Sequence, residues 1–355
     1  MLAGALVMAA LIVASCTWAT STSTSSPTAR AGRAVGTAAR TSTSAAQAEA
    51  SQAGTKAAKA VTSSSDASMT LVKATSAEVV EVRGRITDAS IEPGSCATVA
   101  YTPDTASTTQ VGDLCVPQER THPTAIVLVH GGGGTGGSRV DLEAWQQKYA
   151  DLGYVTFSIP YRLTDAEVDN GVWPEPEQDV KAAIQFIRLA GSTLGTDKVV
   201  VQGHSAGARL GGVILTTPDD AAFRGSELWS EPSDAADAFI GFYGYYTGFQ
   251  FEGSAYYGQG AADPAEFDAN ANAADASGPA LLITGSADSL VEASESEKFD
   301  AALTATGKDT TLISVEGLNH GFDLRDGQLT EEGADAMDQI QVWIAQHVER
   351  ATVAR

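Results

Sequence analysis

Short apolar runs alternate with longer amphipathic stretches over the last two thirds of the chain. The runs are rich in branched aliphatic residues, as in 125–129 (Ala-Ile-Val-Leu-Val). Continuous apolar runs of this length predict strands that are buried on both faces, which is typical of a parallel sheet. The predicted strands are 125–129, 154–159, 198–202, 238–243, 280–284 and 310–315.

Amphipathic stretches separate these strands and predict helices. Between residues 178 and 187, apolar side chains recur at i, i+3, i+4 and i+7, so one face of this helix packs on the sheet. The predicted helices are 139–152, 176–191, 206–216, 292–306 and 331–349. Strands that alternate with helices predict an α/β fold with helices on both faces of a mostly parallel sheet.

Upstream segments have a different character. Residues 78–87, 97–102 and 111–116 alternate between apolar and polar positions and predict an antiparallel entry to the sheet. Residues 17–74 consist largely of Ala, Ser, Thr and Gly, which cannot bury enough surface to offset the entropy of ordering. We therefore expect a disordered tether over 17–74 and one folded domain over 75–355.

The first sixteen residues carry no charge and are apolar almost throughout, which predicts a signal peptide over 1–16. The end of this stretch, Val13-Ala14-Ser15-Cys16, resembles the bacterial lipobox, in which the cysteine receives lipid. Lys and Arg are absent before the apolar core, which departs from that pattern. An exported lipoprotein with Cys16 as its lipidation site is the favoured interpretation; an ordinary cleaved signal and an uncleaved anchor are the alternatives.

Composition limits the classes of partner. The chain has 355 residues, 43% of them hydrophobic, and a formal net charge of −22 at pH 7. Such an acidic chain repels phosphate backbones and anionic lipid surfaces, which argues against nucleic-acid binding and electrostatic membrane binding. Membrane contact is expected only through the lipid anchor.

The chain contains three cysteines. If Cys16 carries lipid, the pair Cys96 and Cys115 remains in an oxidising compartment, and a disulfide between them is expected. Two free buried thiols are the alternative. Neither cysteine has a second cysteine or a histidine at zinc-ligand spacing, so no metal site is expected.

The pentapeptide Gly203-His204-Ser205-Ala206-Gly207 lies where a predicted strand ends and a predicted helix begins. A strand-to-helix turn this tight requires small residues two positions before and after the serine. The pattern therefore predicts a nucleophile elbow with Ser205 as the nucleophile. A bare G-x-S-x-G string also arises by chance in a glycine-rich chain, so partners for the serine are needed.

A glycine-rich loop, His130 to Gly134, follows the strand at 125–129. Such a loop lets backbone N–H groups approach a substrate oxygen closely. A flexible surface loop and a phosphate-binding loop are alternatives, although the latter lacks its Gly-Lys-Ser/Thr ending.

Two further polar groups follow predicted strands. Asp288 comes after the strand ending at 284, and His320 comes after the strand ending at 315. The chain order Ser205, Asp288, His320 is that of a hydrolase triad with serine as nucleophile, histidine as base and aspartate as orienting acid. Glu316, Asp323 and Asp326 are alternative acids, and His347 is interpreted as a solvated or capping residue.

These motifs resemble the α/β-hydrolase superfamily, and within it the esterase/lipase branch with hormone-sensitive-lipase-like and bacterial feruloyl-esterase-like enzymes. The resemblance covers residues from about 95 to 350. It rests on four stretches: His130 to Gly133, residues 159–163 with 173–180, the elbow at Ser205, and Gly317-Leu318-Asn319-His320-Gly321-Phe322. It implies that the N–H groups of Gly132, Gly133 and Ala206 form the oxyanion hole. Gly134 departs from the branch, which often has an aromatic residue there.

An aromatic stretch, 239–257, begins within the predicted strand 238–243 and continues beyond it. We expect a small cap here, after the sixth strand of the full sheet, with Tyr243, Tyr245 and Tyr246 lining the substrate pocket. Ordinary core packing under a loop is the alternative.

The sequence thus predicts a serine esterase that cleaves small-molecule or polymer-borne esters without a cofactor. A serine peptidase of the prolyl-oligopeptidase type is one alternative, although such enzymes usually carry a large additional domain. The other is a non-catalytic surface-binding protein that retains the fold.

Overall fold

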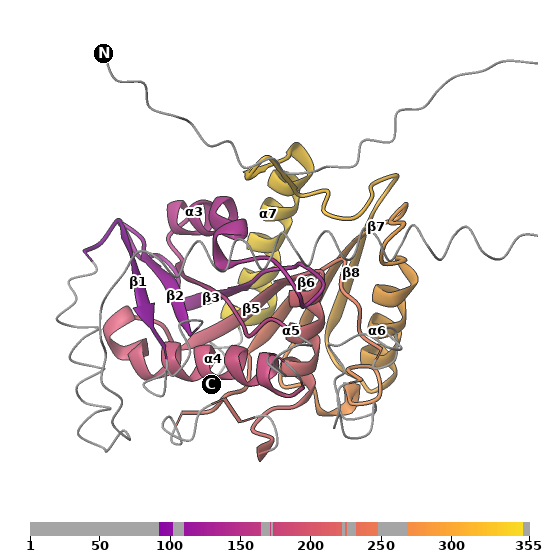
Figure 1. The fold of residues 1–355 in the computed structure, drawn as a ribbon, viewed down its shortest axis with the longest axis horizontal. Helices are drawn as coiled ribbons and strands as arrows, with labels where there is room; N and C mark the ends of the chain where they lie inside the picture. Colours follow the sequence, from indigo (N-terminus) through magenta and orange to yellow (C-terminus); the bar gives the residue numbers. More distant parts are fainter. Residues whose placement is uncertain are drawn as a thin grey trace, which may run out of the picture. The chain divides into compact units, whose positions relative to one another are not determined.

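The computed structural model describes residues 92–101, 110–164, 171, 173–221, 224–225, 232–247 and 268–350. Its central element is an eight-stranded sheet with the strand order β1-β2-β4-β3-β5-β6-β7-β8 (Figure 1). The strands β1 and β2 run antiparallel to their neighbours, and the pairs from β4 to β8 are parallel. The strands are β1 (Ser95–Ala100), β2 (Val111–Val116), β3 (Thr124–Val129), β4 (Val155–Ile159), β5 (Lys198–His204), β6 (Ala238–Phe242), β7 (Ala280–Gly285) and β8 (Thr310–Val315).

Helices connect the parallel strands, as the hydrophobic pattern predicts. The described helices overlap predicted ones within a few residues at either end, except the short 3₁₀ turn over 273–275, which the pattern did not predict. The α/β-hydrolase fold is confirmed. The helices are η1 (Arg139–Leu142), α3 (Glu143–Asp151), α4 (Glu175–Leu194), α5 (Ala206–Thr216), η6 (Ala273–Asp275), α6 (Ser294–Ala305), α7 (Glu331–Ile344) and the π-helical turn η7 (Ala345–Glu349). A small hairpin, β9 (Leu324–Arg325) with β10 (Gln328–Leu329), was not expected because two-residue strands leave no periodic signal.

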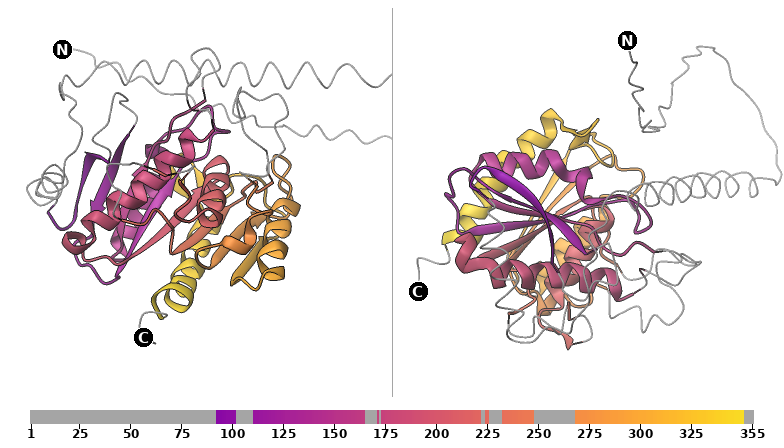
Figure 2. Two further views of the ribbon diagram at one scale, coloured as in Figure 1. Left: turned by 90° about the horizontal axis from the view of Figure 1, so that it is seen from below. Right: turned by 60° about the vertical axis from the view of Figure 1, so that its left-hand side comes forward.

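Two hydrophobic layers enclose the sheet. Alternate side chains of β3 point to opposite faces: Val127 and Val129 belong to one cluster, and Ile126 and Leu128 to the other. The first cluster contains residues of α4, α5 and α6, and the second contains residues of α3 and α7. Figure 2 shows α3 and α7 on one side of the twisted strands and α4 and α5 on the other.

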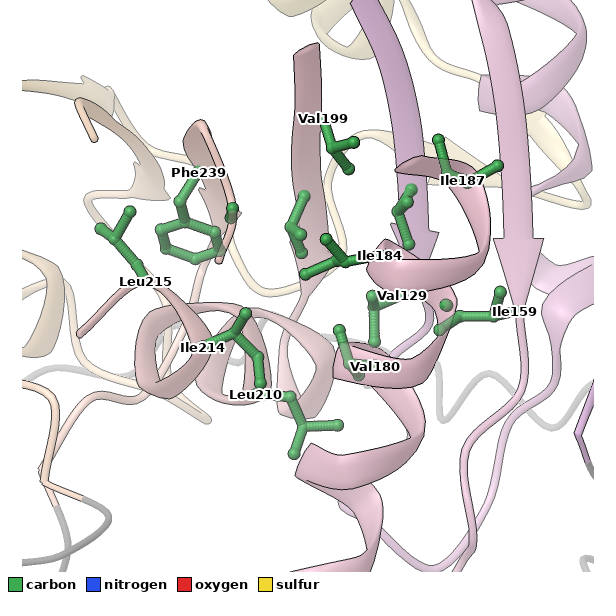
Figure 3. Packing of buried hydrophobic residues seen from close by; sticks show 14 of the residues in the cluster. Val129, Ile159, Val180, Ile184, Ile187, Val199, Leu210, Ile214, Leu215 and Phe239 are labelled. Carbon is green, nitrogen blue, oxygen red and sulfur yellow. The ribbon is translucent and has the colours of Figure 1, made fainter. Parts of the chain in front are cut away.

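The helix α4 illustrates how the sequence positions this packing. Pro176 lies in its first turn, where a missing N–H costs nothing, and Gly195 ends it with a left-handed φ of 67°. The side chains of Val180, Ile184 and Ile187 point from one face of α4 onto the sheet (Figure 3). Full burial of each such side chain contributes about 1.5–3 kcal/mol to folding.

The antiparallel edge of the sheet carries a disulfide. Cys96 on β1 lies directly opposite Cys115 on β2, and the two are joined by a bond. The bridge therefore ties the outermost strand to the rest of the sheet.

Several predictions fall outside the described residues. They are the signal peptide over 1–16, the lipidation site Cys16, the tether over 17–74, the strand over 78–87, and the aromatic stretch beyond residue 247 with its cap. Among the helices that are described, none is both long and apolar enough to cross a bilayer.

Candidate active site

Ser205 forms the turn between β5 and α5, and its backbone is strained. Its φ of 52° and ψ of −114° lie in a region that residues with side chains rarely adopt. A Cβ atom at Gly203 would lie 2.2 Å from the carbonyl oxygen of Gly207, and one at Gly207 would lie 2.2 Å from that of Val129. Both glycines are therefore required, and the serine hydroxyl stands at the carboxyl edge of the sheet.

His320 and Asp288 meet Ser205 from two separate loops. The Oγ atom of Ser205 lies 2.9 Å from Nε2 of His320, and Nδ1 of His320 lies 2.8 Å from Oδ2 of Asp288. Asp288 follows β7 and His320 follows β8, so the carboxyl ends of three parallel strands bring the residues together. The other carboxylate oxygen of Asp288 accepts the N–H groups of Leu290 and Val291, which holds its orientation.

Asn319 joins the loop after β7, which carries Asp288, to the loop after β8, which carries His320. Its Oδ1 atom accepts the backbone N–H of Ser289 at 2.9 Å and the N–H of His320 at 2.8 Å. A second link joins the same loops, because the Ser286 hydroxyl accepts the N–H of Gly317. Sequence analysis missed both links; the position of Asn319 next to His320 was the available signal.

The other candidate acids are placed elsewhere. Glu316 and Asp326 are exposed. Asp323 is fully buried, and its carboxylate accepts the indole N–H of Trp145 at 2.7 Å and the hydroxyl of Tyr243 at 2.6 Å. Asp288 is thus the carboxylate that contacts His320 directly.

The glycine loop lies against the elbow. A Cβ atom built on Gly131 would lie 3.2 Å from Cβ of Ser205. Gly132 and Gly133 have φ values of 114° and 65°, which favour glycine. Neither of their N–H groups, nor that of Ala206 at the start of α5, donates a backbone hydrogen bond to any residue that the structure describes. Among the residues that the structure describes, these three N–H groups thus have no backbone acceptor.

The buried side chain of His130 contacts the glycine loop. Its ring stacks on Tyr161 with centroids 4.4 Å apart, and its Nδ1 lies 2.7 Å from the carbonyl oxygen of Gly131. Burial lowers the pKa of His130, so the neutral ring donates its Nδ1 hydrogen to that oxygen. The Tyr161 hydroxyl in turn donates to the carbonyl of His130.

The stretch around Arg162 has a structural role. Its guanidinium Nε lies 3.0 Å from Oδ2 of Asp179, and its Nη1 lies 3.0 Å from Oε1 of Glu175. These bonds attach the segment after β4 to the start of α4. They explain why residues 159–163 and 173–180 occur together in the sequence motif.

The three predicted pocket tyrosines lie in different surroundings. The ring of Tyr243 packs against His320, with centroids 4.5 Å apart. Tyr246 lies in the core between Phe239 and Phe299, and the Tyr245 hydroxyl accepts a hydrogen bond from Thr247. Within the described contacts, Tyr243 touches the triad and the other two do not, so a pocket role for all three stays a prediction.

In the described part of the chain, no group of three or more His, Cys, Asp or Glu side chains could hold a metal ion. The site holds a serine hydroxyl that contacts a histidine, which in turn contacts a carboxylate, with a glycine loop against the serine. This arrangement and the eight-stranded sheet define the protein as an α/β-hydrolase.

Comparison with known proteins defines the family. The family model BD-FAE matches residues 113–303, more than half of the chain, and the chain belongs to this family. The match includes Ser205 and Asp288 and ends before His320.

A curated esterase is similar in sequence to this chain. Esterase LipC of Mycobacterium tuberculosis (strain ATCC 25618 / H37Rv) is 29% identical over 239 residues, covering 60% of this chain. The match covers 56% of LipC, so the chain spans about half the length of that relative.

Solved structures share the fold. Thermogutta terrifontis esterase 2 phosphoramylated by tabun superimposes with a TM-score of 0.59 at 22% identity, covering 72% of this chain and 97% of the other. The acetyl ester-xyloside bifunctional hydrolase from Caldicellulosiruptor lactoaceticus gives 0.57 at 19% identity, with coverages of 70% and 96%.

Proposed function

We propose that the protein is a carboxylic ester hydrolase that works through an acyl-enzyme intermediate on Ser205. The observation that carries this proposal is the hydrogen-bonded row from Ser205 through His320 to Asp288. Membership of the BD-FAE family and the similarity to an esterase, LipC, support the same reaction class.

The two hydrogen bonds of His320, to Ser205 and to Asp288, determine the direction of proton transfer. Because Nδ1 of His320 donates its hydrogen to Asp288, the lone pair of Nε2 faces the serine hydroxyl. As Oγ attacks the ester carbonyl carbon, Nε2 takes the hydroxyl proton, and Asp288 stabilises the imidazolium that forms. When the tetrahedral intermediate collapses, the C–O bond to the alcohol breaks and the alcohol leaves with that proton. Water then attacks the acyl-serine by the same route.

The negative oxygen of the tetrahedral intermediate requires donors. We assign this role to the N–H groups of Gly132, Gly133 and Ala206. Their lack of backbone partners within the described residues supports the assignment, as does the contact of Gly131 with Ser205. Such donors contribute about 2.7–4 kcal/mol each to transition-state stabilisation.

The proposed substrates are small-molecule or polymer-borne esters, with short-chain lipid esters, acetyl esters and phenolic wall esters as the candidates. One solved relative is named an acetyl ester-xyloside hydrolase, which supports carbohydrate-borne acetyl esters as one member of this set.

The test compares the wild type with Ser205→Ala on p-nitrophenyl esters from acetate to laurate, with methyl ferulate and a prolyl-peptide anilide alongside. We expect ester cleavage by the wild type and a loss of about 10⁴–10⁶ in kcat in Ser205→Ala. A matched control is Ser294→Ala at the start of α6, which should keep full activity. Anilide cleavage without ester cleavage would move the protein to the peptidases. If the wild type neither turns over an ester nor reacts with a fluorophosphonate, the enzyme proposal fails.

We also propose that the protein is exported and that Cys16 receives lipid. The uncharged apolar stretch over 1–16 supports this, and the bond between Cys96 and Cys115 suits an oxidising compartment. Incorporation of a labelled fatty acid that Cys16→Ser abolishes is the expected result, and a secreted form without lipid would contradict it.

A further inference from the structure

Tyr243 links the triad to a buried carboxylate. It directly follows β6, and its ring lies 4.5 Å from the His320 ring at an interplanar angle of 56°. Its hydroxyl lies 2.6 Å from Oδ1 of Asp323. Burial raises the pKa of Tyr243 well above its usual value, with the charge of Asp323 adding to the effect, so the hydroxyl stays protonated and donates.

Asp323 is fixed on the other side. It lies three residues after His320, and its Oδ2 atom accepts the indole N–H of Trp145 from α3. Its backbone carbonyl accepts the N–H of Thr330, which closes the β9–β10 hairpin directly after the loop that carries His320. The carboxylate is fully buried, yet it is compensated by donors on both oxygens.

Tyr243 and Asp323 also contact His204, the residue directly before Ser205. Nδ1 of His204 lies 3.1 Å from the Tyr243 hydroxyl and 3.2 Å from Oδ2 of Asp323. The His204 ring also stacks on Phe242, with centroids 4.6 Å apart and an angle of 3° between the planes. Tyr243 and Asp323 therefore contact both segments whose separation determines the distance from Ser205 to His320.

We propose that Tyr243, held by Asp323, is a positioning residue for His320. Hydrogen bonds at Nδ1 and Nε2 hold the imidazole at its two nitrogens, and the Tyr243 ring blocks a tilt of the imidazole toward β6. The hydroxyl bond to Asp323 keeps the Tyr243 ring in that place. This inference rests on the proposed function, because it assigns a role within the same triad.

The test uses two buried tyrosines that each lose one hydroxyl. Tyr243→Phe removes the bond to Asp323. Tyr101→Phe removes a bond from another fully buried tyrosine, which follows β1 and donates to the carbonyl oxygen of Pro160, at the opposite edge of the sheet from β8. We expect both variants to lose a similar free energy of unfolding. Only Tyr243→Phe should lose kcat, by about tenfold to a hundredfold, with KM unchanged.

A second variant tests the same bond from its other end. Asp323→Asn keeps the Tyr243 side chain intact and weakens the acceptor that holds its hydroxyl. We expect a kcat loss of similar size, and little additional loss when it is combined with Tyr243→Phe, because both changes break one interaction. Additive losses in the double variant would contradict a shared route.

The readouts separate this inference from the proposed function. If the wild type cleaves esters in a Ser205-dependent manner and Tyr243→Phe keeps the kcat of Tyr101→Phe, Tyr243 has a purely structural role and the inference fails. If the wild type is inert, the proposed function fails. The downfield proton resonance of His320 Nδ1–H then still tests positioning: it should weaken in Tyr243→Phe and persist in Tyr101→Phe, and an unchanged resonance in both would overturn the inference.

Discussion

Nε2 of His320 lies 2.9 Å from Oγ of Ser205, although 115 positions of the chain separate the two residues. The contact exists because β5 and β8 end at the same edge of the sheet, with β6 and β7 between them. A substitution in the loop after β8 can therefore displace His320 while the turn that carries Ser205 stays unchanged.

Asp288→Asn tests the orienting acid. An amide in this position can donate to Nδ1 of His320, which places the ring hydrogen on Nε2 and removes the lone pair that faces Ser205. We expect kcat for ester cleavage to fall by about 10⁴. Glu316→Gln is the matched control, since Glu316 is exposed in the same region, and it should retain activity. The reverse outcome would assign the acid to Glu316.

Two neighbouring glycines of the proposed oxyanion loop should respond differently to alanine. A Cβ at Gly132 would lie 2.1 Å from the carbonyl oxygen of Gly136, whereas one at Gly133 has no heavy atom within 4 Å. Gly132→Ala must therefore displace the loop, and we expect kcat to fall at least about a hundredfold. Gly133→Ala meets only the backbone cost of a positive φ, about 1–2 kcal/mol, and should stay within about tenfold. Equal losses of kcat in the two variants would show that catalysis does not depend on the backbone conformation of this loop.

Reduction of the bond between Cys96 and Cys115 should lower thermal stability. The bond closes a separation of 19 residues, which corresponds to about 3 kcal/mol in the chain-entropy model. For a domain of this size we expect Tm to fall by about 6–12 °C. Ester cleavage at 25 °C should be unchanged, because β1 lies at the opposite edge of the sheet from β8. Alkylation and mass spectrometry that found two free thiols in the untreated exported protein would contradict the prediction.

Asp323 should contribute to the acid sensitivity of the fold. Burial by itself raises its pKa, but His204 and the hydrogen bonds from Tyr243 and Trp145 outweigh burial, and the pKa lies below 3.8. As the pH falls from about 4 toward this lower value, the unfolded chain binds the proton first, so the free energy of unfolding decreases. In Asp323→Asn this part of the acid dependence should disappear, and stability at pH 7 should be lower by about 2 kcal/mol.

The measurement is the denaturant midpoint from pH 3 to pH 7. Asp326→Asn is the matched control, because Asp326 is exposed on the same loop, and its pH profile should follow the wild type. Parallel profiles for Asp323→Asn and the wild type would show that Asp323 does not carry the effect.

Much of the fold and the triad candidates could be predicted because their signals are local. A strand buried on both faces is a continuous apolar run, and Ser205 and Asp288 each follow one such run. His320 follows β8, a half-buried edge strand whose sequence still predicts a strand. The close approach of Gly203 to Gly207 is likewise local, although Gly207 also packs on the distant Val129.

The surroundings of the triad could not be predicted because their partners are distant in the chain. Asp323 looked like one of several loop carboxylates; its burial depends on Trp145 and Tyr243, which lie 178 and 80 positions away. The aromatic run could not separate Tyr243, which lies against His320, from Tyr246, which lies in the core. Both are tyrosines in one glycine-interrupted segment, and only the tertiary contacts distinguish them.

Ser205 keeps its strained backbone only while three neighbouring segments hold it. Gly207 packs on the end of β3, the Ser205 N–H donates to Phe242 on β6, and Gly131 packs against the serine itself. Such strain stores about 1–3 kcal/mol, which is released as soon as one of these contacts opens. Relaxation of the elbow is therefore favoured over melting of the whole sheet, and heating should silence the serine several degrees before the helices unfold. A fluorophosphonate label taken up at increasing temperature would then record the state of this one turn, independently of the global transition seen by circular dichroism.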